Sequence, residues 1–433
     1  METSPFEVKA DHPLWQALGM DVARFENMRK MLGQAYANLY LSQKNRPAGM
    51  AYFDELVRVL HSDRVGEILA QKQEGKPVVG TFCVFVPEEL VLAAGGVCVG
   101  LCAGSQGPVP DAEKVLPRNI CPMVKSAYGF KVGAVCPYFQ SVDFVYGETT
   151  CDAKKKTWEL LDRHVPTHVM EIPQRKNARD KALWLDEVKE FKARIEAVAG
   201  KTAGVAEIRQ AVQLMNGKRR ALQRLNALRA ARPAPISGKD ALLIEQLAFI
   251  DEPVRFTWQV NSLCDELDRR VADGVGVAPA DAPRVLVSGT PMALPNWKLH
   301  NVIEAAGAVV VNEESCIGTR YFKDLMDEDA ATVDEQLERL TERYMKIDCS
   351  CFTPNDERVS QVLKEYGESG AEGVVHYCLQ FCHTYNIEAV KIKDACEARG
   401  IPFLAIESDY SPEDVGQLQT RIEAFLEQIR EQR

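Results

Sequence analysis

The chain has 433 residues, of which 46% are hydrophobic and 26% are charged, with a formal net charge of −10 at pH 7. A chain of this length is too long for one compact core and predicts two or three domains. The acidic balance argues against general nucleic-acid binding, although a local basic patch can still bind a phosphorylated ligand.

The N-terminal segment METSPFEVKADHPLW is charged, is broken by prolines and contains no apolar signal core. No later stretch has the roughly 18 uninterrupted apolar residues that span a bilayer. We therefore expect a cytoplasmic protein that does not bind a membrane. The odd number of cysteines, 13, then disfavours a full disulfide framework, because the cytosol keeps ordinary thiols reduced, and metal binding explains them better.

The N-terminal part of the chain is expected to be helical. Apolar residues recur at helical spacing through MRKMLGQAYANLYL and FDELVRVLHSDRVGEILAQ, which predicts an N-terminal helical layer over residues 1–76. Short apolar runs then alternate with helical segments. Strands are predicted at VVGTF, VCVGL, DFVYG and HVMEI, and helices at PEELVLAAG, 119–130 and 151–163. This alternation is typical of βαβ units and predicts a first α/β domain over 77–176.

A helical region over residues 177–280 is predicted to connect two α/β domains. Its stretch RQAVQLMNGKRRALQRLNALRAAR contains basic side chains and no acidic ones. The basic residues are Arg209, Lys218, Arg219, Arg220, Arg224, Arg229 and Arg232. A run of like charge is usually a solvated helix face, and the alternative is a docking site for a partner or an anionic acyl carrier.

The second α/β domain is predicted over residues 281–433. Its strands are RVLVSG, AVVVNE, GVVHYCLQF and PFLAIE, and its helices are NWKLHNVIEAAG, 355–369, 384–399 and 412–430. The predicted fold class is therefore two doubly wound, parallel-sheet, flavodoxin-like domains with additional helices. Open α/β sheets bind ligands at the carboxyl ends of their strands, so we expect these ends to face a shared cleft.

Most cysteines follow apolar runs, at the edge where that cleft is expected. Cys121 in LPRNICPMVKS and Cys151 in GETTCDAKKKTWELL each open a helix, whose N-terminal amides stabilise a thiolate. The second domain adds Cys316, Cys349, Cys351, Cys378 and Cys382. Their spacing is not that of a zinc ribbon, a thioredoxin or a compact ferredoxin. We interpret them as an iron–sulfur site held by distant loops of two domains.

Free cysteine is commonly a small buried hydrophobe, and this is the prediction for Cys83, Cys98, Cys264 and Cys396. For Cys136 and for Cys378 the core and ligand interpretations both stay open.

His376 and His383 flank the Cys378/Cys382 loop and are candidate catalytic proton donors, with a structural histidine as the alternative for each.

No nucleotide phosphate loop is visible. The sequence GKT at 200–202 has Ile195 where the first P-loop glycine would stand. We therefore expect that this chain does not hydrolyse ATP. Glu88 and Glu89 open the PEELVLAAG helix, where acidic side chains favour the helix N-terminus.

Several segments together resemble the 2-hydroxyacyl-CoA dehydratase D-component superfamily, and more closely its homodimeric branch, the double-cubane cluster proteins. They are VPEELVLAAGG, LPRNICPMVKSAYGF, GETTCDAKKK, ESCIGTRYF, CSCFTPNDER and LQFCHTYNIE. The resemblance implies that Cys121, Cys151 and Cys382 bind one cubane. The branch implies a double-cubane [8Fe-9S] cluster with six cysteine ligands. Cys316 and Cys349 are assigned to its second cubane, and Cys102 is the sixth ligand, ahead of the alternates Cys351, Cys378 and Cys136.

The same resemblance implies an anaerobic, ATP-dependent electron-transfer system. This chain would form a homodimer, receive low-potential electrons from a separate ATP-hydrolysing [4Fe-4S] reductase (activator) dimer, and reduce a small molecule, with acetylene as a plausible assay substrate. The alternatives are a radical 2-hydroxyacyl-CoA dehydratase subunit with one [4Fe-4S] cluster, a non-catalytic electron carrier or cluster-storage protein, and a structural zinc protein.

Overall fold

Two parallel four-stranded sheets form the framework of residues 6–433, which the computed structural model describes. Their orders are β2-β1-β3-β4 and β6-β5-β7-β8. The strands are β1 Val78–Thr81, β2 Val97–Gly100, β3 Phe144–Glu148, β4 Thr167–Met170, β5 Arg284–Gly289, β6 Val309–Glu314, β7 Gly373–Leu379 and β8 Phe403–Ser408. Each predicted strand is present. In both sheets the first strand lies between the second and third, as in a doubly wound fold, so the predicted fold class is confirmed.

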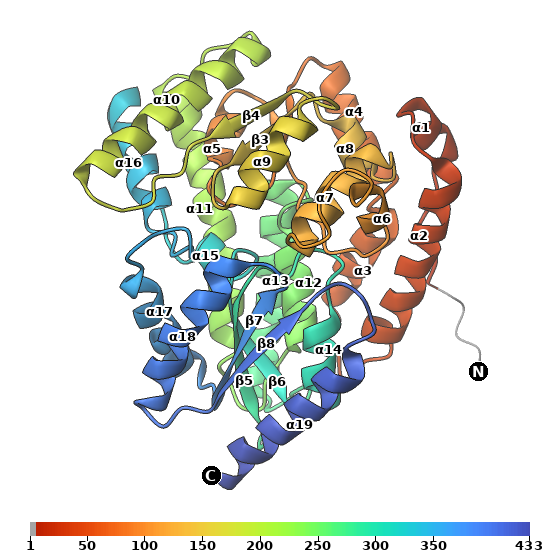
Figure 1. The fold of residues 1–433 in the computed structure, drawn as a ribbon, viewed down its shortest axis with the longest axis vertical. Coiled ribbons are helices and arrows are strands. Elements are labelled where there is room, and N and C mark those ends of the chain that lie inside the picture. The colour runs from red at the N-terminus through yellow and green to blue at the C-terminus, as the bar shows by residue number, and fades with distance from the viewer. Residues whose placement is uncertain (1–5) are drawn as a thin grey trace.

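The two sheets lie one above the other along the long axis of the molecule (Figure 1). Helices of the first domain are α5 Glu88–Ala93, α6 Val109–Ala112, α7 Pro122–Val132, α8 Pro137–Ser141 and α9 Asp152–Leu161. Those of the second are α14 Lys298–Ala305, α15 Thr319–Phe322, α16 Val333–Met345, α17 Asp356–Ser369, α18 His383–Glu397 and α19 Val415–Glu431. The helices predicted from the sequence do not include α16, although a capping box at Thr332 and Glu335 marks its start.

The N-terminal helices run alongside both domains (Figure 1, red). They are α1 His12–Ala17, α2 Val22–Tyr36, the π-helical turn η1 Ala37–Leu41, α3 Met50–Val59 and α4 Asp63–Gln73. Tyr36 and Tyr40 pack on Trp297 beside α14, with ring centroids 5.9 and 5.0 Å apart. Tyr138 of the first domain donates a hydrogen bond to the carbonyl of Leu60. The layer therefore braces the two domains against each other.

The connecting region is helical, as predicted, and contains α10 Ala178–Ala199, α11 Val205–Leu228, α12 Gly238–Leu247 and α13 Pro253–Ala272. One hydrophobic cluster runs through the N-terminal layer, the connecting helices and both sheets. The boundaries after residues 76, 176 and 280 stay predictions, because this core crosses all of them. No helix within residues 6–433 has the length and apolar character needed to cross a membrane.

The expectation of a solvated basic face is wrong for part of α11 and its C-terminal end. Arg219 and Arg229 are buried and pair with Glu89 at 2.6 Å and Glu313 at 2.5 Å. Lys218 is buried as well and lies 3.6 Å from Glu88. A buried cation needs a nearby anion, so these pairs fix α11 against both domains and leave fewer cations for a docking surface. Glu88 and Glu89 therefore have a second role besides favouring the start of α5, because they are the anionic partners of Lys218 and Arg219.

Candidate metal centre

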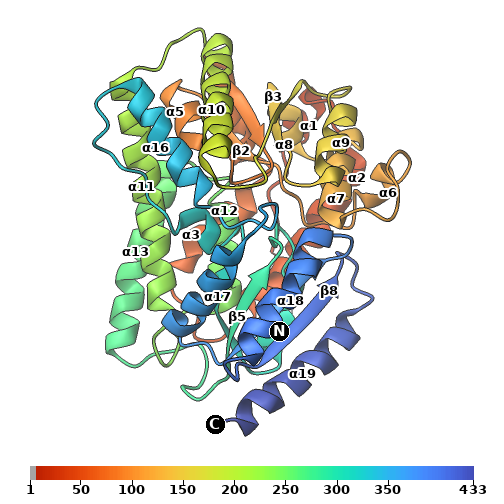
Figure 2. The same ribbon diagram turned by 60° about the vertical axis from the view of Figure 1, so that its left-hand side comes forward.

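The carboxyl ends of the two sheets face each other across a cavity of about 390 Å³, between the domains seen in Figure 2. Eight cysteines of the described residues line it. They are Cys83, Cys102, Cys121, Cys151, Cys316, Cys349, Cys351 and Cys382. All six predicted ligands are in this set, together with the alternate Cys351. The cavity therefore collects thiols from loops of both domains, at the edge where a doubly wound sheet binds its ligand.

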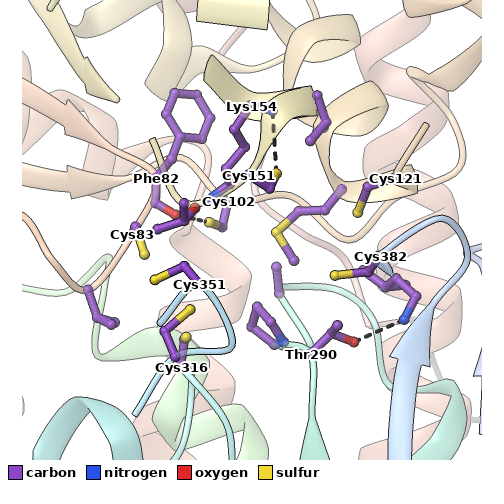
Figure 3. Close-up of a pocket in the computed structure, with 18 of the residues that line it drawn as sticks. Phe82, Cys83, Cys102, Cys121, Cys151, Lys154, Thr290, Cys316, Cys351 and Cys382 are labelled. Carbon is purple, nitrogen blue, oxygen red and sulfur yellow. Dashed lines mark hydrogen bonds between the residues drawn. The ribbon is translucent and has the colours of Figure 1, made fainter. Parts of the chain in front are cut away.

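Three of these cysteines share one local structure. Cys121, Cys151 and Cys382 are the N-cap residues of α7, α9 and α18. The Sγ atom of Cys151 accepts a hydrogen bond of 3.5 Å from the backbone amide of Lys154. In Figure 3 Cys121 and Cys382 lie on one side of the cavity, and Cys151 lies near its middle, beside Cys102. Helix N-termini carry free amides and the positive end of the helix dipole, which stabilise negative charge on sulfur.

Burial opposes ionisation of these thiols in the absence of a cation. It raises the pKa of Cys121 to about 12, and the neighbouring sulfur atoms of Cys382 and Cys151 add to the effect. It also raises the pKa of Cys151. Buried thiols with raised pKa values lose their protons readily only when they bind a metal. The donor set thus fits a thiolate-bound metal group.

A second group contains Cys83, Cys316, Cys349 and Cys351. A hydrogen bond from Cys83, together with Arg320, lowers the pKa of Cys316 to about 6. A hydrogen bond from Cys351 likewise lowers the pKa of Cys349. Figure 3 shows Cys83, Cys316 and Cys351 on the side of the cavity opposite Cys121 and Cys382.

Cys83, which is predicted to be a core residue, packs against the hydrophobic core and also lines the cavity. It lies just past the carboxyl end of β1, so it stands at the same sheet edge as the other cavity cysteines. The strand VVGTF immediately before it was the available signal, because any residue just past a central parallel strand lies near the ligand site.

Cys102 lies beside the second group. Its Sγ atom donates a 2.6 Å hydrogen bond to the carbonyl of Phe82, as drawn in Figure 3. Burial raises its pKa to about 12, an effect that Lys154 opposes and Glu148 and Cys316 increase.

The other alternates do not line the cavity. The Sγ atom of Cys378 is directed to the carbonyls of Leu379 and Cys382, at 3.5 and 3.4 Å. Cys136 is the N-cap residue of α8 and lines a different cavity. Cys264 and Cys396 are buried in the hydrophobic core, as predicted. Cys98, also predicted to be a core residue, is half-buried and contacts Thr81.

The two candidate proton donors are placed differently. His376 lies within β7, where its Nε2 atom is 3.2 Å from the carbonyl of Tyr385, and it does not line the cavity. Burial lowers the pKa of His376 to about 3, so its ring is neutral at pH 7. His383 is exposed and lines the cavity at the start of α18.

Lys154 is a half-buried lysine of the cavity that the sequence does not single out. Lys154 lines the cavity and pairs with Glu148, which is itself fully buried. Its side chain is 13% exposed, against 48% for Lys155 and 65% for Lys156. Burial disfavours its charge, but Glu148 and the thiols of the cavity outweigh burial and hold the pKa of Lys154 well above its usual value. A positive charge therefore stands among the cysteines.

The described residues do not bring three Cys, His, Asp or Glu side chains together around one point as ligands of a single ion. A structural zinc ion needs four such donors at bonding distance. A polynuclear iron–sulfur group differs, because its thiolates bind separate iron atoms. The spread of the eight thiols is compatible with the second arrangement.

The fold and the cavity define a protein of two doubly wound α/β domains that enclose a cysteine-lined site. Residues 83–429 match the family described as 2-hydroxyglutaryl-CoA dehydratase, D-component, and the chain belongs to this family. The resemblance to the D-component family is thereby confirmed, and membership of the double-cubane branch stays a prediction.

Relatives cover most of the chain. YjiM of Escherichia coli (strain K12) is 38% identical over 371 residues, which are 84% of this chain and 94% of that protein. The beta subunit of (R)-2-hydroxyglutaryl-CoA dehydratase from Acidaminococcus fermentans is 25% identical over 83% of this chain and 94% of its own. A subunit of benzoyl-CoA reductase from Thauera aromatica is 23% identical over 79% of this chain and 88% of its own. The last two relatives thus belong to a dehydratase and a reductase.

Proposed function

We propose that this chain is the iron–sulfur component of an ATP-dependent low-potential reductase and that it holds a double-cubane [8Fe-9S] cluster. The observation that carries the proposal is the presence of two groups of cysteines in one cavity. A single cubane bound by three cysteines would use only Cys121, Cys151 and Cys382, and would leave the second group without a role.

In this proposal Cys316 and Cys349 bind the second cubane, and Cys102 completes its ligand set. Cys351 and Cys83 are the alternatives for that sixth position, because both line the same side of the cavity. When bound, the cluster supplies electrons at low potential. The side chains of Lys154 and Arg320 place positive charge beside the thiolates and lower the electrostatic cost of each added electron.

Electrons would arrive from a separate ATP-hydrolysing [4Fe-4S] reductase dimer that docks on a homodimer of this chain. The sequence has no phosphate-binding loop, which supports ATP use by the partner. The substrate would be a small molecule, and reduction of acetylene to ethylene consumes two electrons and two protons. His383 is the candidate histidine that lines the cavity.

A radical 2-hydroxyacyl-CoA dehydratase subunit is the second candidate. The beta-subunit relatives from A. fermentans and Clostridium sporogenes support it, since their names describe acyl-CoA dehydratases. In that case one [4Fe-4S] cluster on Cys121, Cys151 and Cys382 would serve, and the second group of cysteines would be incidental.

The test is turnover with the complete system. Anaerobically loaded protein, mixed with an ATP-hydrolysing reductase of the family and MgATP, is expected to form ethylene from acetylene, and omission of ATP should stop the reaction. Dehydration of a 2-hydroxyacyl-CoA with no acetylene turnover would favour the second candidate. Reversible reduction without turnover of either substrate would instead identify an electron carrier.

A further inference from the structure

A second cavity of about 570 Å³ adjoins the cysteine cavity. It lies between α2, the loop that follows β2, the loop that precedes α14, and the segment between β8 and α19. Met31 of α2, which is 72% exposed, stands at its edge. The cavity thus runs from the surface of the N-terminal helical layer toward the interior.

Only a thin partition separates the two cavities. Gly100, Cys102, Ile250 and Leu294 line both of them. The backbone amide of Gly104 donates a 3.0 Å hydrogen bond to the carbonyl of Leu294, which joins the loops of the two domains at this point. A Cβ atom at Gly104 would meet the carbonyl of Ala293 at 2.0 Å, so glycine allows this close approach. Cys102, one of the proposed ligands, is therefore reached from the second cavity.

The walls of the second cavity are apolar and carry no free charge. Apolar lining residues include Phe25, Leu32, Leu39, Phe130, Phe139 and Val302. Its two cations are both neutralised within residues 6–433. Arg29 pairs with Glu26 at 2.5 Å, and Lys298 pairs with Asp414 at 2.6 Å. An anionic ligand such as a coenzyme A phosphate would find no unpaired cation here.

Two buried polar atoms in the lining have no hydrogen-bond partner among the described residues: the hydroxyl of Tyr410 and the Nδ1 atom of His61. Burial raises the pKa of Tyr410 well above its usual value, and the thiols of Cys121 and Cys102 contribute to the shift. Burial lowers the pKa of His61 to about 4. Both groups are therefore uncharged at pH 7.

We propose that the second cavity is the binding and entry site for an uncharged, mainly apolar small substrate, which reaches the cluster past Cys102 with Tyr410 as its hydrogen-bonding neighbour. The proposal rests on the reductase function and specifies its substrate class. An apolar pocket with one or two polar groups accepts such a molecule without the cost of burying a charge.

Xenon and acetylene are the probes, and two variants of α2 make a matched pair. Ala35→Trp places an indole in the cavity, whereas Gln34→Trp adds the same side chain on the exposed face of the helix. Apolar cavities of this kind bind xenon. In xenon-pressurised crystals of the loaded protein, we expect a xenon atom beside Leu32 in the wild type and in Gln34→Trp, and none in Ala35→Trp. A wild-type cavity that stays free of xenon would overturn the proposal.

Kinetics test the route. Ala35→Trp is expected to raise KM for acetylene about tenfold while kcat and iron content are retained, and Gln34→Trp should match the wild type. An unchanged KM in Ala35→Trp would show that substrate enters elsewhere and would overturn the proposal. So would tight binding of acetyl-CoA that Ala35→Trp abolishes. If the wild type binds xenon yet never reduces acetylene, the reductase function fails while the apolar binding site stands.

Discussion

The guanidinium group of Arg320 contacts the sulfur atom of Cys316, with Nη1 3.5 Å from Sγ. The same Nη1 donates a hydrogen bond to the hydroxyl of Tyr385, whose own proton is directed to the sulfur of Cys349 at 3.7 Å. Glu314 and the carbonyl of Gly289 hold the remaining guanidinium nitrogens. One buried cation thus reaches two proposed ligands of the second cubane, directly and through Tyr385.

Removing the Tyr385 hydroxyl should make the cluster harder to reduce. Hydrogen bonds to ligand sulfur atoms stabilise the reduced, more negative state. We expect Tyr385→Phe to retain its iron and to shift the midpoint potential by about 60 mV to more negative values, a tenfold change for a one-electron couple. EPR-monitored redox titration measures the shift. Tyr366→Phe, which alters a tyrosine of the other hydrophobic cluster, is the control. Equal potentials in the two variants would exclude the role of Tyr385.

Serine variants of Cys382 and Cys378 compare a cysteine that lines the cavity with a nearby cysteine that does not. Cys382→Ser should lose iron and the visible absorption of the first cubane, because serine is a poor ligand for iron in such clusters. Cys378→Ser should keep both, since its sulfur is directed to backbone carbonyls. Iron analysis and absorption spectra decide the matter. Full iron content in Cys382→Ser would refute the first cubane as assigned.

Cys102 is tested against Cys136 in the same way. Cys102→Ser should lose the EPR signal of the intact double cluster, whereas Cys136→Ser, which alters a thiol of the second cavity, should keep it. Retention of every iron atom in Cys102→Ser would move the sixth ligand to Cys351 or Cys83. Single serine variants of those two residues would then identify it.

Lys154 and Lys155 are adjacent in sequence and both line the cavity, but the side chain of Lys154 is 13% exposed and pairs with Glu148, whereas that of Lys155 is 48% exposed and pairs with Asp152. Removing the positive charge of Lys154 should make electron addition less favourable. We expect Lys154→Met to keep its iron and to have a more negative midpoint potential than Lys155→Met, measured by EPR-monitored titration. A common potential for both variants and the wild type would show that this charge does not act on the cluster.

Much of the site was predictable from local sequence. Cys121, Cys151 and Cys382 each follow a recognisable loop and open a predicted helix, so their common edge followed from the rule for parallel sheets. Cys83 packs on the core as predicted, but its place in the cavity wall was not predicted, because the same apolar run that predicts β1 also suits a buried core thiol. Nothing in the sequence shows that Lys154 is less exposed than Lys155 and Lys156, since the exposure of each lysine depends on how α9 is rotated about its axis relative to the cavity.

The burial of the cations of α11 could not be predicted from local sequence patterns for a different reason. Arg219 finds its anion in Glu89, and Arg229 finds it in Glu313, each far away in the chain. A run of like charge predicts exposure only when no distant partner exists. His376 likewise follows a clear strand pattern, but the strand pattern alone does not show that its ring stacks on Phe403 of β8, away from the cavity lining.

The central claim is that one chain holds a double-cubane cluster. Its most direct test is anaerobic determination of iron and acid-labile sulfide per chain, combined with EPR of the reduced protein. The account predicts about eight iron atoms and about nine sulfides per chain, with the EPR signal of two coupled cubanes. About four of each, with the spectrum of an isolated [4Fe-4S] cluster and tight binding of an acyl-CoA, would contradict it.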